Sequence, residues 1–236
     1  MAKKLLPLLL LILAGILCWA QEEEPSAQPP PDPKLEALVK KMDEVQKNLK
    51  TLRVTFTQTN QFRMLSKPQV FKGVLTLKKP DTALYRYTSP SSLYFLVKDG
   101  DLLVYNPAEK KVVVQDIRRH QNRIIRYLGV GQPMEELRSN FQVTWVGEEG
   151  DVAQLCLVPK KLRLRRKFSM LTFWVDAQTG YLKAFELVES EGDRIRFDFS
   201  HWEENPALTD DAFKVEIPPG VKVHRQLMDL AEPFQR

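Results

Sequence analysis

The sequence predicts a mainly β domain of the α+β class, with about eleven antiparallel strands, one N-terminal helix and a helical insertion in the middle of the chain. Three observations lead to this fold class. Apolar residues recur at helical spacing over 33–52, alternate with polar residues in many short segments after residue 53, and lose that alternation between 120 and 140. No repeat of fixed period is present, which argues against a propeller or a solenoid.

The predicted N-terminal helix spans 33–52. Asp32 is a good N-cap, and Pro33 suits the first helical position because its missing N–H would have no partner there. Beyond it, apolar residues recur every three or four positions while lysines and acids fill the other face. The segment is therefore expected to be amphipathic, with one side packed on the sheet.

Six strands are predicted before the insertion and five after it. The first follows Arg53, where Val54 and Phe56 alternate with threonines. Turn residues separate the strands, and connections of about two to five residues are too short for parallel crossovers, so the strands are expected to be antiparallel. The other predicted strands are 70–78, 83–87, 93–98, 102–105, 111–116, 141–146, 153–158, 169–176, 182–190 and 194–201.

The helical insertion is predicted over 120–128 and 133–140, and a last apolar segment over 213–217 precedes Pro218, Pro219 and Gly220. The expected organisation is a signal peptide at 1–20, a disordered leader rich in proline and glutamate at 21–32, a domain at 33–224 and a tail at 225–236.

The signal peptide is predicted from charge, apolar core and cleavage pattern together. Lys3 and Lys4 precede an apolar run, and Cys18 to Ala20 place small residues before a cut ahead of Gln21. The run is too short for a comfortable membrane span. We therefore expect export through a cleaved signal peptide. An uncleaved anchor and lipidation at Cys18 are the alternatives, although Leu17 is bulky where a lipobox has a small residue.

Export leaves Cys156 as a lone cysteine, so no internal disulfide is expected and the domain must hold itself by core burial. Removal of Lys3 and Lys4 lowers the formal charge from +5 to +3. That excess is too mild to indicate a nucleic-acid partner.

Catalytic patterns are not recognisable in the sequence. His120, His201 and His224 stand far apart and in no metal-binding spacing, and Cys156 lies in an apolar strand where a buried, inert thiol is expected. Gly129 and Gly131 form a Gly-x-Gly loop without the third glycine of a nucleotide-binding turn. We expect no enzyme activity, no metal and no cofactor.

A basic run lies between two predicted strands. Its expected role is either a solvated hairpin loop or a contact patch for anionic head groups or an acidic partner. The members of this candidate patch are Lys160, Lys161, Arg163, Arg165, Arg166 and Lys167.

Several local strings resemble the LolA family of periplasmic lipoprotein carriers. They include Thr55-Phe56-Thr57-Gln58, the run from Gly73 to Pro80, Tyr85 to Pro90, Val104 to Pro107, and the closing run from Phe213 to Val221. They occur in the family's order from about Leu35 to Val223. Each string is weak alone, and together they are specific.

The resemblance implies an incomplete, unclosed antiparallel β-barrel with helices forming a lid over an apolar cavity. It implies a carrier that takes acylated lipoproteins from an inner-membrane ABC lipoprotein release complex to an outer-membrane acceptor or the outer membrane itself. We expect a monomer. The alternatives are the same fold with another lipid or glycolipid as cargo, an envelope lipid or lipoprotein sensor, and a hydrolase or structural envelope protein with scattered active residues.

Strand alternation indicates which side chains line such a cavity. The candidate lipid-binding residues are Val54, Phe56, Leu75, Leu77, Ala83, Tyr85, Tyr87, Ile124, Ile125 and Leu128, the last three on the mid-chain lid. The family's Lys-Arg-Pro motif carries an arginine that bonds the lid backbone, and here that position is Lys79. Lysine supplies one compact charge in place of a planar fork, so we expect a weaker or different lid latch at Lys79.

Overall fold

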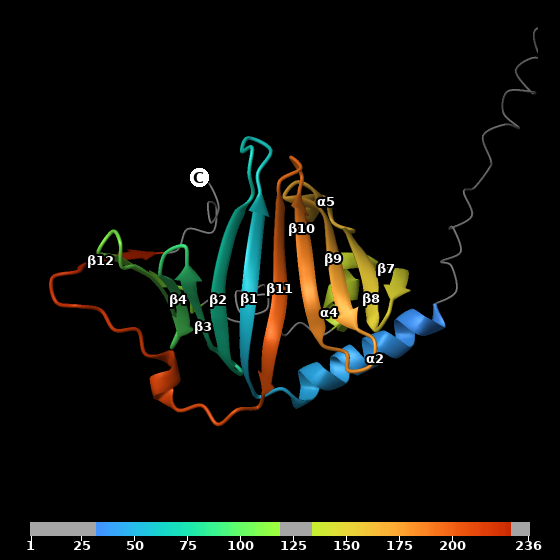
Figure 1. The fold of residues 1–236 in the computed structure, drawn as a ribbon, viewed down its shortest axis with the longest axis horizontal. Helices are drawn as coiled ribbons and strands as arrows, with labels where there is room; N and C mark the ends of the chain where they lie inside the picture. The colour runs from blue at the N-terminus through green and yellow to red at the C-terminus, as the bar shows by residue number, and fades with distance from the viewer. Residues whose placement is uncertain (1–31, 119–133, 228–236) are drawn as a thin grey trace, which may run out of the picture. The chain divides into compact units, whose positions relative to one another are not determined.

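The structure is a computed structural model that describes residues 32–118 and 134–227. It contains an unclosed twelve-stranded sheet with the order β12-β6-β5-β4-β3-β2-β1-β11-β10-β9-β8-β7 (Figure 1). With three helices beside it, the sheet fits the predicted incomplete barrel. The strands are β1 (Thr51–Gln61), β2 (Gln69–Lys78), β3 (Thr82–Ser89), β4 (Leu93–Lys98), β5 (Asp101–Asn106), β6 (Lys111–Asp116), β7 (Phe141–Glu149), β8 (Val152–Pro159), β9 (Phe168–Asp176), β10 (Leu182–Glu189), β11 (Arg194–Glu204) and β12 (Lys222–Leu227).

Eleven strands match the predicted ones, and β12 is an addition. It pairs in parallel with β6, with Val223 beside Val112, whereas the other pairs are antiparallel. The long connection from β11, which includes the short 3-10 helix η1 (Asp210–Phe213), lets the chain return to the far edge of the sheet. The sequence of β12 is rich in lysine, arginine and histidine and does not show the alternation typical of a strand. The sequence pattern alone therefore does not predict β12.

Helix α2 (Pro33–Asn48) begins where predicted, because the Asp32 carboxylate accepts a hydrogen bond from the Lys34 backbone N–H at 2.9 Å. It ends four residues earlier than predicted. The side-chain oxygen of Asn205 accepts hydrogen bonds from the backbone N–H groups of Lys50 and Thr51 at 2.7 and 3.2 Å. This partner, distant in sequence, draws Thr51 into β1 and overrides the apolar periodicity that continues to Leu52.

Helix α4 (Met134–Asn140) is the second half of the predicted mid-chain insertion, and the first half, 120–128, lies outside the described residues. A single turn, α5 (Leu162–Arg165), connects β8 to β9. In the parts of the chain that the structure describes, no helix is long and apolar enough to cross a membrane.

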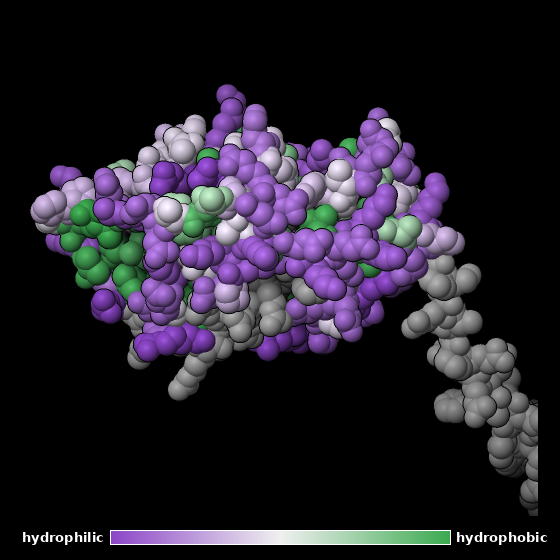
Figure 2. Space-filling model, turned by 90° about the horizontal axis from the view of Figure 1, so that it is seen from below, coloured by the Kyte–Doolittle hydropathy of each residue, from purple (hydrophilic) through white to green (hydrophobic). Residues whose placement is uncertain are grey.

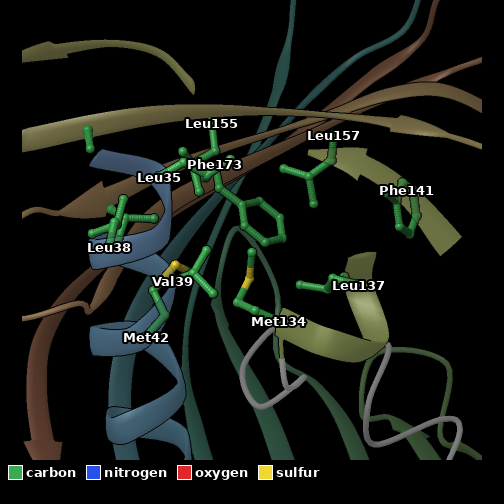
Figure 3. Close-up of a cluster of buried hydrophobic side chains, with 12 residues drawn as sticks. Leu35, Leu38, Val39, Met42, Met134, Leu137, Phe141, Leu155, Leu157 and Phe173 are labelled. Atoms are coloured by element: carbon green, nitrogen blue, oxygen red, sulfur yellow. The ribbon is translucent and has the colours of Figure 1, made fainter. Parts of the chain in front are cut away.

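The apolar faces of α2 and α4 pack on β7 to β10. These two helices and four strands are called the helix-covered half of the molecule. Figure 3 shows α2 side chains directed toward Met134 on α4 and Phe173 on β9. Leu155 and Leu157 on β8 have no exposed surface. Interdigitation of two helices with one sheet face gives this half a closed core.

The β9–β10 turn fixes the position of α2. Gly180 has a φ of +80°, and a Cβ atom there would lie 2.8 Å from the backbone carbonyl carbon of Lys41. The Lys41 ammonium donates to the Ala177 carbonyl of the same turn at 2.7 Å. Only glycine allows helix and turn to approach this closely.

Candidate functional site

A row of aromatic rings lies on one face of the sheet, the face on which α2 packs, and crosses six strands. Successive ring centroids are 5.8 Å apart from Phe95 to Tyr87, 5.0 Å from Tyr87 to Phe56, 5.6 Å from Phe56 to Phe197 and 4.9 Å from Phe197 to Phe185. Phe185 on β10 already belongs to the helix-covered half, and its ring centroid lies 6.5 Å from that of Phe173 on β9. Strands β1 to β4 with β11, which carry most of the row, are called the aromatic half.

Gly73 allows the row to cross β2. It stands opposite Phe56 on β1 and Tyr87 on β3, in register with both. A Cβ atom at this position would lie 2.6 Å from the end of the Phe56 ring and 2.5 Å from the Arg86 carbonyl oxygen. The missing side chain therefore makes room for the Phe56 ring to lie across the strand and contact Tyr87.

Beyond the rings, toward the end of β1, the same face of the sheet carries polar side chains. The Tyr87 hydroxyl donates to the Gln58 side-chain oxygen at 2.6 Å, and the Gln58 amide donates to the Asn60 oxygen at 2.8 Å. Burial raises the pKa of Tyr87 to about 12, so the hydroxyl stays protonated and remains a donor. Burial and, after it, Tyr87 also raise the pKa of Tyr85. These groups are neutral hydrogen-bonding partners beside an apolar surface.

Seven of the ten candidate lipid-binding residues come together on this face. Val54, Leu75 and Tyr85 are cross-strand neighbours on β1, β2 and β3. With Phe56, Leu77 and Ala83 they are buried, and Tyr87 is half-buried. Ile124, Ile125 and Leu128 lie outside the described residues. Lipid contact at all ten stays a prediction.

Several members of this face were not predicted from the sequence. Phe185, Phe197 and Phe199 come from β10 and β11, more than a hundred residues after Phe56, and pack in or against the same cluster. The signal for two of them was present, because Phe197 and Phe199 alternate with the polar Arg196, Asp198 and Ser200. Only the pairing of β1 with β11 shows that both strands direct these rings to one surface.

At the end of the sheet away from α2, apolar side chains remain accessible to solvent. Phe95 and Val104 are opposite each other on β4 and β5, and most apolar residues of these strands are only half-buried. Figure 2 shows apolar side chains gathered at the end of the sheet where β4 to β6 and β12 lie, whereas the surface near α2 is mostly polar. This end therefore retains apolar area that a ligand can bury.

Lys79 links the β2–β3 turn to α2. Its ammonium donates to the Gln46 backbone carbonyl in the last turn of the helix at 2.6 Å. Burial lowers the pKa of this lysine below its ordinary value. A latch between Lys79 and the mid-chain lid stays a prediction, since residues 119–133 are outside the described part of the chain.

The basic patch forms the connection between β8 and β9, around α5, and all six of its cationic residues are exposed. Three of them fix the connection in place. Lys160 donates to the Arg138 carbonyl at 2.7 Å, Lys161 to the Asn140 side chain at 2.9 Å and Arg165 to the Pro159 carbonyl at 2.8 Å. All three bonds go to neutral oxygens, and none of the six cations forms an ion pair with an acidic residue in the described part of the chain.

No cluster of three side chains that could hold a metal ion occurs among the described residues. His201 and His224 are exposed on different strands, and His120 lies outside the described part. Cys156 is half-buried, not buried as expected, because alternation gives the buried face to Leu155 and Leu157. A hollow of about 370 Å³ beside α2 is lined mainly by polar residues and does not suit an acyl chain.

The sequence model of the family described as "Outer membrane lipoprotein carrier protein LolA" matches residues 47–216, well over half of the chain. An outer-membrane lipoprotein carrier protein of Dechloromonas aromatica (strain RCB) is 28% identical over 183 residues, covering 75% of this chain and 82% of the relative. One of Pseudomonas paraeruginosa (strain DSM 24068 / PA7) is 22% identical, covering 79% of this chain and 87% of the relative.

Among solved structures, an uncharacterized conserved protein from Thermus thermophilus has a similar fold. The TM-score is 0.53 at 12% identity, and the match covers 79% of this chain and 98% of the other. At that identity the likeness concerns the fold alone, and it agrees with the architecture described above.

Proposed function

The chain belongs to the LolA family, and on this premise we propose that it is a periplasmic carrier that shelters the acyl chains of lipoproteins between the inner and the outer membrane. The names of its relatives, outer-membrane lipoprotein carrier proteins, support this cargo. The proposed role is binding, without catalysis. The proposed route to the periplasm is export through a signal peptide at 1–20 that is then removed.

The observation that carries the proposal is the aromatic row. Each methylene of an acyl chain gains about 0.8 kcal/mol on leaving water, so a multiply acylated protein needs an apolar surface to cross an aqueous space. Half-buried rings such as Tyr87, Phe95 and Phe197 supply that surface, because part of each ring is still accessible. Deeper members such as Phe56 already contact other rings and become available when the neighbouring rings shift.

The polar residues beside the row suit the other part of the cargo. The lipid attached to such a protein carries ester and amide groups, which lose hydrogen bonds with water on binding. Gln58 and Asn60 present neutral side-chain amides next to the rings. We propose that these groups lie against the head of the lipid while the acyl chains lie along the aromatic row.

Release also follows from this chemistry. Rings and aliphatic side chains give contacts without a fixed geometry, so no single interaction anchors the cargo. In this proposal the mid-chain lid closes over the chains through Ile124, Ile125 and Leu128. An inner-membrane ABC release complex loads the carrier, and an acceptor at the outer membrane unloads it.

The test is native mass spectrometry of the full-length protein isolated from the periplasm of cells that express it. A co-purifying acylated polypeptide supports the proposal. A free lipid or glycolipid in its place supports the same fold with a different cargo or a sensing role. Neither species, together with turnover of an ester substrate, contradicts a carrier function and favours a hydrolase.

A second experiment addresses transport. Depletion of the protein, followed by separation of the inner and outer membranes, is expected to leave lipoproteins in the inner membrane. Normal arrival of lipoproteins at the outer membrane after depletion contradicts the proposal.

A further inference from the structure

We propose that one end of the sheet docks on an anionic lipid surface. This basic rim consists of three connections, residues 62–68, 160–167 and 190–193, which join β1 to β2, β8 to β9 and β10 to β11. Figure 1 shows all three at the same end of the strands, with α2 crossing the opposite end. The strand registers agree, since Gln61 pairs with Arg194 and Glu189 with Phe168 at this end.

Hydrogen bonds make the three connections one continuous surface. The Arg63 backbone N–H donates to the Asp193 carboxylate at 2.8 Å, and its guanidinium donates to the Glu191 carbonyl at 2.7 Å. On the other side, the Ser190 backbone N–H donates to the Lys167 carbonyl at 3.1 Å and its hydroxyl to the Arg166 carbonyl at 3.0 Å. These bonds hold the backbones of the three connections next to one another.

The rim has a strong excess of positive charge. Its three connections contain eight lysines and arginines but two acids, Glu191 and Asp193. Arg163, Arg166 and Lys167 are exposed and make no ion pair or side-chain hydrogen bond with any described residue. Because no described acidic residue forms an ion pair with these three cations, they are available to a partner that approaches from outside.

Large apolar side chains stand among these charges. Met64 is 96% exposed, Leu162 65% and Leu65 46%. Exposed apolar tips next to lysine and arginine are typical of segments that lie in a membrane interface, where the tips enter the acyl boundary and the cations meet anionic head groups. An acidic protein partner explains the charges but not the three exposed apolar tips.

The experiment uses the purified mature protein and two kinds of vesicle, one of phosphatidylglycerol with phosphatidylethanolamine and one of phosphatidylcholine alone. Sedimentation with the anionic vesicles is expected, with little sedimentation with the neutral ones. A lysine or arginine near an anionic surface strengthens binding by about fivefold. The triple variant Arg163→Gln, Arg166→Gln, Lys167→Gln is therefore expected to bind about a hundredfold more weakly.

The matched control removes the same charge from the opposite end of the strands: Lys40→Gln, Lys47→Gln and Lys50→Gln, all on or just after α2 and all exposed. It is expected to bind nearly as the parent does. A second variant, Met64→Ser with Leu162→Ser, keeps every charge. High salt screens the attraction between charges, so the apolar contribution dominates there. Under that condition the variant is expected to lose the binding that the parent keeps. All variants should keep the melting temperature of the parent.

No binding to anionic vesicles, or equal weakening by the control and the rim variant, overturns the proposal. The first outcome leaves an acidic protein as the partner, and the second indicates attraction by net charge alone. Because the vesicles contain no lipoprotein, either failure is distinct from failure of the carrier function.

Discussion

In the helix-covered half of the molecule, side chains of β8 and β9 meet those of α2 and α4, and the core is closed from both sides. In the aromatic half, rings meet rings along the sheet, and several of them remain half-buried. The same strand alternation produces both halves. The comparison indicates that the first half has a closed core, while the second combines a buried cluster with accessible apolar surface, which the proposed function assigns to the cargo.

The largest expected effect is a loss of stability that differs between the two faces of the sheet in the helix-covered half. Leu157→Ala removes a fully buried side chain from the closed core, so the free energy of unfolding should fall by about 2–5 kcal/mol. Val158→Ala, the next residue on the other face and 41% exposed, should change it by less than about 0.5 kcal/mol. Urea unfolding measures both, and similar losses would contradict a closed core on one face.

A smaller loss is expected in the aromatic half from Gly73→Ala. The new methyl group collides with the Phe56 ring and the Arg86 carbonyl, and overpacking of this kind costs about 1–3 kcal/mol. The near-ultraviolet circular dichroism of the rings should change as Phe56 moves away from Tyr87.

Gly147→Ala is the matched control, because a Cβ atom on this β7 glycine meets nothing within 4 Å. Its stability should be unchanged or slightly higher, since alanine has a less flexible unfolded chain. If Gly73→Ala is equally harmless, close packing of Phe56 over Gly73 is not what lets the row cross β2.

The smallest effect concerns the connection between the halves. Burial lowers the pKa of Lys79 in the folded protein, so at alkaline pH the unfolded chain binds more protons at this position. Stability should therefore rise with pH from the folded pKa up to the ordinary lysine pKa of about 10.4.

The comparison variant is Lys79→Met, which removes this titration. The difference in the free energy of unfolding, parent minus variant, should shift in favour of the parent as pH rises from neutral to about 10. A pH-independent difference would show that Lys79 is not desolvated where it bonds Gln46.

Eleven strands and the start of α2 could be predicted from the sequence because their causes are local. Alternation, turn residues and the Asp32 cap all lie within a few residues of what they determine. The end of α2 was predicted wrongly because Asn205, far along the chain, decides it. Strand β12 was missed because its pairing with β6, not its own pattern, makes it a strand.

The candidate site shows the same limit. Alternation placed Val54, Phe56 and Tyr87 on one face, but it could not show that Phe197 joins them, since strand order is a tertiary property. Nor could it show that Gly73 leaves room for the Phe56 ring, because that depends on a register between two strands. The sequence therefore contained the members of the row but not their contacts.

The central claim, that cargo acyl chains lie on the aromatic face, is tested most directly by photo-crosslinking in living cells. p-Benzoylphenylalanine replaces Phe95 in one strain and Tyr94 in another. These neighbours on β4 lie on opposite faces, Phe95 against Tyr87 and Tyr94 against Tyr105. We predict crosslinks to acylated polypeptides from position 95 and not from 94. Equal crosslinking from both positions, or none from position 95 in the folded protein, would contradict the claim.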